Sequence, residues 1–214
     1  MKIGIIGTGN MAAGFARRLA LSGTPFVLGG RDQGKARALT ETLGGNSRVA
    51  PISEVVHESE LLVPALPYQE LLAALPTLGD LTGKTLLDIT NPITGDFAAL
   101  TIGFTSSAAE EIQKAVVGAH IVKAFNTIFA SLLDLPDEQT RDTQVFYATD
   151  HPQARELAAS FIQSVGFAPV FAGPLSNSRY LEPLGELNIH FGYMLGHGTA
   201  IAPSWQSLSA KEFA

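Results

Sequence analysis

The first residues that can bind a charged ligand are the glycines near the N-terminus. Residues 3–12 read I-G-I-I-G-T-G-N-M-A, an apolar run followed by the pattern G-x-G-x-x-A. Gly7 allows a tight turn, Gly9 lets backbone N–H groups approach a diphosphate, and Ala12 lets a helix pack closely on the preceding strand. Free N–H groups and the dipole of a helix that starts near Asn10 favour an anion. The pattern therefore predicts a dinucleotide-binding turn rather than a glycine turn without a ligand.

The second predicted strand, residues 25–29, ends in a sequence that distinguishes between dinucleotides. Enzymes that use NAD usually carry Asp or Glu at this strand end, where the carboxylate accepts from the ribose 2′-hydroxyl. Here Gly30 and Arg31 follow the strand, and Lys35 lies in the first turn of the next helix. Cations are unfavourable at a helix N-terminus unless an anion is bound between them, and the 2′-phosphate of NADP is such an anion. We therefore expect NADP(H) as the cofactor. The alternative is NAD with Asp32 as the ribose acceptor, although Asp32 can instead cap the helix.

The later predicted strands end in residues that suit the rest of the cofactor and a substrate. Ligands of open α/β sheets bind beyond the carboxyl ends of the strands. Strand 60–64 is followed by three small or apolar residues that suit the ribose and nicotinamide half: Ala65, Leu66 and Pro67. The next two strands are followed by Asn91-Pro92 and Phe125-Asn126-Thr127, whose amides and hydroxyl could orient a carboxamide or a substrate carbonyl. The alternative is that they only form turns and caps.

We therefore expect Asn91 and Pro92 to contact the cofactor. The residues that we expect to line a substrate pocket are Asn91, Phe125, Asn126, Thr127 and Leu175.

Composition excludes several other functions. The 214-residue chain has a formal net charge of −6 and no Lys/Arg cluster, which argues against a nucleic-acid partner. It has no cysteine, which excludes disulfides and Cys-ligated metals and favours a reducing, cytoplasmic compartment. His190 and His197 are too far apart for the usual helical metal pair, so we expect no metal site. We expect no signal peptide or membrane span, because the first strand begins at Lys2 and no apolar run reaches about 18 residues.

Strand and helix signals alternate along the chain, which predicts an α/β fold: a doubly wound, mostly parallel sheet of Rossmann type. The strands expected after residue 100 are 120–124, 144–148 and 168–171. We expect residues 1–172 to form the NADP-binding domain and residues 173–214 a small helical segment that covers the substrate cleft. Within that segment, Ser176 is the expected N-cap of a long helix, and Pro183 is expected to kink it or end its first turn.

Polar and apolar residues of this expected helix fall on separate stripes. Arg179, Glu182, Glu186 and His190 share one face, which we expect to be solvated or functional, while Leu181 and Leu184 share the packing face.

Five sequence pieces resemble the family of NADPH-dependent oxidoreductases that reduce the deazaflavin coenzyme F-420. They are G-T-G-N-M at 7–11, G-R-x-x-x-K at 30–35, S-S-A-A-E at 106–110, V-K-A-F-N-T at 122–127 and G-P-L-S-N-S-R at 173–179. The nucleotide-binding fold of this family recurs in membrane ferric reductases of the six-transmembrane type. The resemblance implies that Thr8, Asn10 and Met11 contact the diphosphate and that Arg31 and Lys35 hold the 2′-phosphate. It also implies a cleft in which a second ring system stacks on the nicotinamide.

The expected function is hydride transfer between NADP(H) and a small-molecule acceptor, either a flavin- or deazaflavin-type ring or a small organic substrate. No acid–base set stands out in the sequence, which agrees with a transfer that mainly needs two aligned rings. One alternative is an imine reductase similar to pyrroline-carboxylate reductases. Those chains share the N-terminal motif but continue into a helical dimerisation region, whereas this chain returns to strands. Another alternative is a non-catalytic NADP(H)-binding redox sensor. We also expect a homodimer.

Overall fold

Six parallel strands form the main sheet of the protein, in the order β3-β2-β1-β4-β5-β6. The computed structural model describes residues 1–44 and 46–206. The six strands are β1 (Ile3–Ile6), β2 (Phe26–Gly29), β3 (Ser47–Val49), β4 (Leu61–Pro64), β5 (Thr85–Asp88) and β6 (His120–Lys123). This is the Rossmann strand order, and the expected fold class is confirmed. The order reverses between β1 and β4, which is where ligands of such sheets bind.

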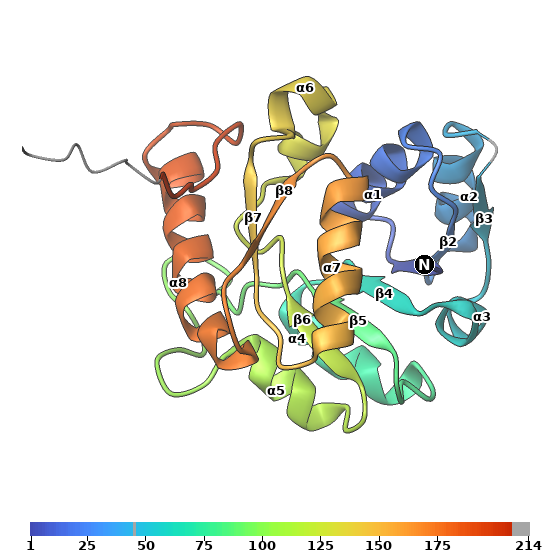
Figure 1. Ribbon diagram of the computed structural model, residues 1–214, viewed down its shortest axis with the longest axis horizontal. Coiled ribbons are helices and arrows are strands. Elements are labelled where there is room, and N and C mark those ends of the chain that lie inside the picture. Colours follow the sequence, from blue (N-terminus) through green and yellow to red (C-terminus); the bar gives the residue numbers. More distant parts are fainter. Residues whose placement is uncertain (45, 207–214) are drawn as a thin grey trace, which may run out of the picture.

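Helices cover both faces of this sheet, as the apolar strands require (Figure 1). The helices along residues 10–164 are α1 (Asn10–Leu21), α2 (Gln33–Glu41), α3 (Ile52–Glu58), α4 (Tyr68–Ala74), α5 (Ala108–Ala115), α6 (Asp137–Thr140) and α7 (Pro152–Ser164). Buried side chains of α1, α2 and α7 belong to one hydrophobic cluster, and those of α3, α4 and α5 belong to another. The chain is therefore wound over both sides of the sheet.

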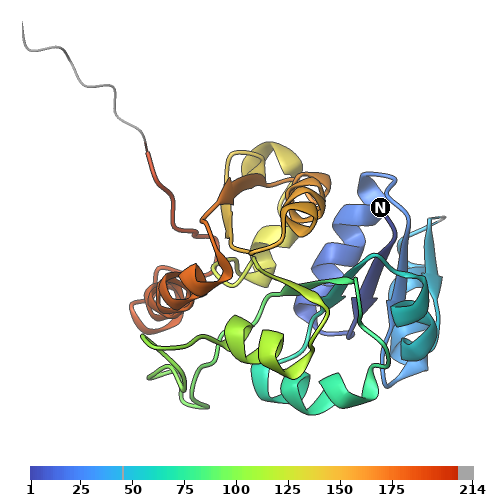
Figure 2. The ribbon, with the colours of Figure 1, turned by 60° about the horizontal axis from the view of Figure 1, so that its bottom comes forward.

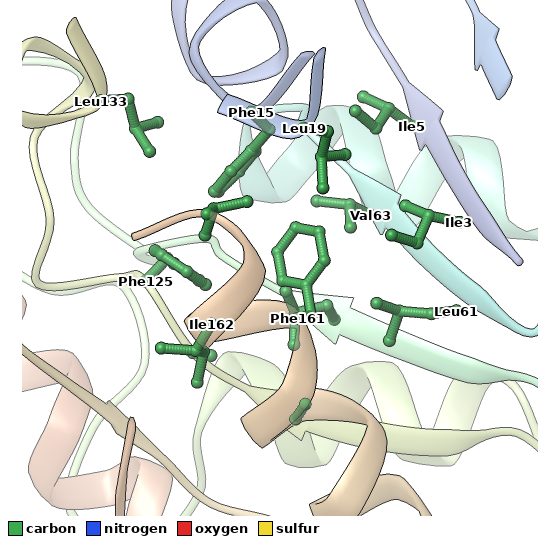
Figure 3. Packing of buried hydrophobic residues seen from close by; sticks show 14 of the residues in the cluster. Ile3, Ile5, Phe15, Leu19, Leu61, Val63, Phe125, Leu133, Phe161 and Ile162 are labelled. Atoms are coloured by element: carbon green, nitrogen blue, oxygen red, sulfur yellow. The ribbon is translucent and has the colours of Figure 1, made fainter. Parts of the chain in front are cut away.

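Three phenylalanines from distant parts of the chain meet in the larger cluster. Phe15 of α1 lies with its ring centroid 4.9 Å from that of Phe125, and both lie within 6 Å of Phe161 of α7. Figure 3 shows these rings pointing into the same space, next to Val63 of β4. This contact holds the chain that follows β6 against α1. The segments that leave the ends of β1 and β6 therefore lie close together.

Strands 144–148 and 168–171, expected from the sequence, form a small parallel sheet of their own. Its strands are β7 (Gln144–Tyr147) and β8 (Ala168–Phe171), and α7 connects them. One antiparallel bridge, between Lys123 and Ala148, joins this pair to the end of β6. Side chains alternate along β7, so that Tyr147 faces the α7 cluster and Phe146 faces away from it.

Helix α8 (Ser178–Ile189) packs on that second face of β7 and β8 and continues as a π-helical turn, His190–Met194. In Figures 1 and 2 it stands apart from α1 to α3, on the far side of the small sheet. A 3₁₀ turn, Leu175–Asn177, precedes it, so Ser176 is not its N-cap, and the helix runs on through Pro183 instead of ending there.

The face of α8 that was expected to be solvated or functional is not solvated at Glu182, which is 1% exposed. The expected segment covers residues 173–214, of which 207–214 lie outside the described residues.

Candidate functional site

The glycine turn lies between the end of β1 and the start of α1. Gly7 has a φ of +124°, and a Cβ there would lie 2.7 Å from the carbonyl oxygen of Ala65, so glycine is required on two grounds. At Gly9, the N-cap of α1, a Cβ would meet nothing within 4 Å in the described part of the chain. Its α-carbon instead borders an open cavity, next to the unpaired N–H groups of the first turn of α1. This cradle fits a diphosphate.

That cavity has a volume of about 670 Å³ and lies at the reversal point between β1, β2 and β4. Nine residues assigned to the cofactor from the sequence line it: Gly7, Thr8, Gly9, Gly30, Arg31, Lys35, Ala65, Leu66 and Pro67. Its size suits one half of a dinucleotide rather than a single phosphate.

The basic end of the cavity is formed by the chain that follows β2. Asp32 is the N-cap of α2, and its Oδ1 accepts from the backbone N–H of Lys35 at 3.0 Å. The carboxylate therefore satisfies the helix start. Arg31 is 87% exposed, with one contact of 3.3 Å from its Nη2 to Glu70 Oε2. Such an exposed pair is weak, so the guanidinium is free to turn towards an anion.

A second cavity, of about 250 Å³, lies beyond the ends of β5 and β6. It is lined by four of the predicted substrate residues, Asn91, Phe125, Asn126 and Thr127, and by Met11 from α1. The opposite wall comes from α8 and the π turn, through Gly185, Asn188, Ile189 and Tyr193. Gly9 lines the first cavity and Met11 lines the second, so residues only two positions apart at the start of α1 border the two cavities.

The other predicted site residues lie elsewhere. Asn10 lines another cavity, with Arg17 and Ser131. Pro92 is buried and lines neither the first nor the second cavity. Leu175 is 3% exposed, because its side chain packs in the cluster with α5, while its N–H donates to Asp150 Oδ1 at 3.0 Å. The structure thus does not bring Leu175 to the substrate-side cavity.

Phe125 adopts a left-handed backbone with a φ of +58°, which is unfavourable for a large side chain. Its ring is held in the core by Phe15 and Phe161, and the chain turns sharply there, directly after β6. Asn126 and Thr127, which line the cavity, directly follow this strained residue.

An interlocked pair of asparagines closes the base of the second cavity. Asn91 Nδ2 donates to the backbone carbonyl of Asn126 at 2.6 Å, and Asn126 Nδ2 donates to Asn91 Oδ1 at 3.0 Å. Asn126 Nδ2 also donates to the carbonyl of Leu181 in α8 at 2.7 Å. A Cβ at Gly185 would lie 2.6 Å from Asn91 Oδ1 and 2.7 Å from Asn126 Nδ2, so glycine alone lets α8 approach this closely.

Aromatic side chains flank the mouth of the same cavity. The ring of Tyr193 lies edge-on to Phe129 at 5.5 Å between centroids, and 6.4 Å from Phe97. Tyr193 and Phe97 are 60% and 44% exposed. Their exposed faces can stack on a planar ligand.

A buried ion cluster beside the site was missed from the sequence. Lys123 Nζ lies 2.7 Å from Asp88 Oδ2, 2.8 Å from Glu182 Oε1 and 2.8 Å from the carbonyl of Thr90. Burial alone would lower the pKa of Lys123, but the two carboxylates hold it above its ordinary value. Glu182 also accepts from the N–H of Ala108 at 2.9 Å, at the start of α5. The cluster fastens α8 to the sheet and to α5. The sequence contained a signal for this cluster, because a lysine at the end of a buried strand needs a partner of opposite charge.

The same cluster affects a neighbouring tyrosine. Burial first, and then the charges of Glu111, Glu182 and Asp88, raises the pKa of Tyr68 to about 12. Its hydroxyl therefore stays protonated at neutral pH.

Residues 2–92 match the family model described as "NADP oxidoreductase coenzyme F420-dependent". The chain is also 30% identical, over 207 residues, to the "F420-dependent NADP reductase" of Methanothermobacter marburgensis. That alignment covers 89% of this chain and 92% of the relative. The chain belongs to this NADP oxidoreductase family.

Other members and relatives share most of the chain. A "putative f420 dependent nadp-reductase" of Arthrobacter sp. FB24 has a crystal structure that superposes with a TM-score of 0.79 at 29% identity, covering 93% of this chain and 96% of that one. "Metalloreductase STEAP3" of Rattus norvegicus is 30% identical over 185 residues, which cover 86% of this chain and 36% of that longer protein.

This family member is accordingly an NADP-dependent oxidoreductase with a Rossmann-type fold. Within residues 1–44 and 46–206, no helix is long and apolar enough to cross a membrane. Over the same residues, no three His, Asp or Glu side chains gather as they would around a metal ion.

Proposed function

We propose that this oxidoreductase transfers a hydride between NADP(H) in the first cavity and a flavin- or deazaflavin-type ring in the second. The observation that carries the proposal is that Gly9 lines the first cavity and Met11, two residues further on, lines the second. A dinucleotide bound at the glycine turn would therefore direct its nicotinamide end towards the acceptor. NADP(H) supplies or accepts the hydride at its nicotinamide ring. The chain binds the two rings, aligns them and excludes water.

The cofactor residues divide by the part of the nucleotide that they would hold. Gly7, Thr8, Gly9, Asn10 and Met11 would surround the diphosphate, next to the start of α1. Gly30, Arg31 and Lys35 would hold the 2′-phosphate. Ala65, Leu66 and Pro67 would pack on the ribose, and Asn91 would lie towards the nicotinamide, with the buried Pro92 behind it.

The acceptor would enter between Phe97 and Tyr193 and lie over Phe125, Asn126 and Thr127. A planar apolar ring suits this position because three aromatic side chains flank it, Phe97, Phe129 and Tyr193. We propose that residues 173 onward act as the cover of this cleft, since α8 and its π turn supply one wall. A homodimer and a cytoplasmic location stay predictions; light scattering and cell fractionation test them.

Nucleotide titration tests the 2′-phosphate site. Arg31→Ala is expected to weaken the binding of NADP⁺ by about 1.5–3 kcal/mol, the strength of a charged hydrogen bond, and to leave the binding of NAD⁺ almost unchanged. Arg141→Ala replaces an exposed arginine whose ion-pair partner among the described residues is Asp142, at 3.9 Å; it is the matched control and should change the binding of neither nucleotide. Equal losses for both nucleotides would mean that Arg31 supports the loop instead.

The glycine turn is tested by Gly9→Val, which should abolish calorimetric binding of NADP⁺ while the circular dichroism spectrum stays that of the wild type. A branched side chain there would occupy the space of the diphosphate. Gly103→Val is the control, because its Cβ would likewise meet no described atom within 4 Å but lies away from the cavity. Retained binding in Gly9→Val would remove the basis of the proposed cofactor site.

A panel of acceptors distinguishes the proposed reaction from its alternatives. NADPH oxidation is followed with flavins, a deazaflavin, quinones and cyclic imines. Turnover confined to imines would establish the imine-reductase alternative. Tight NADPH binding without turnover of any acceptor would favour the redox sensor.

A further inference from the structure

Two buried polar atoms at the second cavity have no hydrogen-bond partner among the residues that the structure describes. They are Asn126 Oδ1 and Thr127 Oγ1. The two residues are 5% and 1% exposed, and both line the cavity. Leaving a buried polar atom unpaired is costly, so each of these atoms needs a partner from outside the described chain, such as a water or a ligand group.

The orientation of the Asn126 amide is dictated by its surroundings. Its Nδ2 faces the carbonyl oxygen of Leu181, which can only accept a hydrogen bond, so the nitrogen and not the oxygen must lie there. The second N–H is used by Asn91 Oδ1. Asn91 cannot be turned round either, because its own Nδ2 faces the carbonyl of Asn126. Both amide hydrogens of Asn126 are therefore committed, and only the acceptor atom remains.

We propose that Asn126 Oδ1 is a dedicated acceptor for an N–H group of the bound ring system, with the Thr127 hydroxyl able to donate to a neighbouring carbonyl. The complementary ligand group is an amide edge, N–H beside C=O. This assignment rests on the proposed function, because the ring must occupy the second cavity. The sequence left open whether Asn126 orients a carboxamide or a substrate carbonyl. The assignment favours the carboxamide, because the amide of Asn126 has no hydrogen left to donate to a carbonyl.

Two ring systems carry such an edge. The nicotinamide has a primary carboxamide, and flavin-type rings have an imide N3–H between two carbonyls. The chemistry of recognition is the same, and ligand analogues that lack only the N–H separate the two sources.

The first arm uses 3-acetylpyridine adenine dinucleotide phosphate, in which a methyl group replaces the carboxamide NH₂. Calorimetry on the full chain should show this analogue binding about 3- to 10-fold more weakly than NADP⁺, the loss of one hydrogen bond. In Asn126→Ala the two nucleotides should bind equally. In Asn46→Ala, an exposed asparagine that lines neither cavity, the wild-type preference should persist.

The second arm compares lumiflavin with 3-methyllumiflavin by fluorescence titration of the protein loaded with NADP⁺. A loss of about 3- to 10-fold on methylation, absent in Asn126→Ala, would assign the acceptor atom to the flavin-type ring. If Asn126→Ala does not fold, the two comparisons of ligand and analogue on the wild-type protein still show whether the N–H group contributes to binding.

The proposal is overturned if the wild-type chain binds both analogues as tightly as their parents. Failure of NADP⁺ to bind at all would instead refute the proposed cofactor site, and the two failures are distinguishable in the same titration.

Discussion

Gly185 allows the contact between α8 and the floor of the second cavity, and its replacement by alanine tests the geometry most directly. A Cβ at this position would lie 2.6 Å from Asn91 Oδ1, 2.7 Å from Asn126 Nδ2 and 2.8 Å from Asn126 O. The last of these is backbone, held by the turn at Phe125, and it cannot move aside cheaply. Helix α8 must therefore shift outward, or the asparagine pair must separate.

Two effects of opposite sign set the size of the loss. In a helix, alanine is intrinsically favoured over glycine by about 1 kcal/mol. Overpacking costs about 1–3 kcal/mol, and each broken asparagine hydrogen bond adds about 1 kcal/mol. Overpacking and broken bonds together exceed the gain, so we expect Gly185→Ala to lower the free energy of unfolding by about 1–3 kcal/mol. For a chain of this size, Tm should fall by about 2–4 °C for each kcal/mol.

Urea unfolding and thermal scans measure the stability, and steady-state kinetics measure the site. Because the shift displaces the asparagine pair and leaves the glycine turn intact, kcat should fall, while the Kd for NADP⁺ should rise by no more than about 10-fold, the loss of one hydrogen bond. Gly95→Ala is the matched control: its Cβ would contact no described atom within 4 Å, and the change should be neutral or slightly stabilising. A Gly185→Ala protein as stable and as active as the wild type would refute the packing of α8 described above.

Two further predictions concern buried charge and pH. Glu182→Gln should lower the free energy of unfolding in urea by about 1–3 kcal/mol, because it removes one charged hydrogen-bond partner of the buried Lys123 while Asp88 still balances the lysine charge. Glu156→Gln on the exposed side of α7 should have little effect, and equal losses would contradict the role of the cluster. Burial, and then the ring of His151 stacked at 4.2 Å, lowers the pKa of His120 below its ordinary 6.5. The folded state then binds this proton less well than the unfolded chain, so the stability contribution is complete above pH 6.5 and is lost as the pH falls below it. His120→Gln should reduce the change of the urea midpoint between pH 5 and 7. The same change in the variant and the wild type would contradict this role of His120.

The strands and the glycine turn could be predicted because their signals are local. An apolar run followed by G-x-G-x-x-A specifies a strand, a turn and a helix within ten residues, and Asp32 before Gln33 specifies a cap. The carboxyl ends of parallel strands then bring Asn91 and Asn126 to one edge of the sheet. Topology alone places these residues near each other.

The details that depend on long-range packing could not be predicted in this way. The stripe of α8 suggested a solvated Glu182, but its partners Lys123 and Ala108 are 59 and 74 positions away in sequence. Likewise, the need for glycine at 185 comes from a contact with Asn91 and Asn126, not from any turn in α8. No periodicity in the sequence contains this information.

The buried face of α1 limits how this protein can be divided. Phe15 packs on Phe125 and Phe161, and Arg18 donates to the carbonyls of Leu132 and Leu133 at 3.0 and 2.9 Å. These partners lie beyond residue 92, where the match to the family model ends. A fragment cut at that boundary would expose the aromatic face of α1 to water and would remove the backbone carbonyls that Arg18 contacts. The nucleotide-binding half is therefore not a transplantable module, and chimaeras of this enzyme should exchange α1 together with the segment from Phe125 to Phe167.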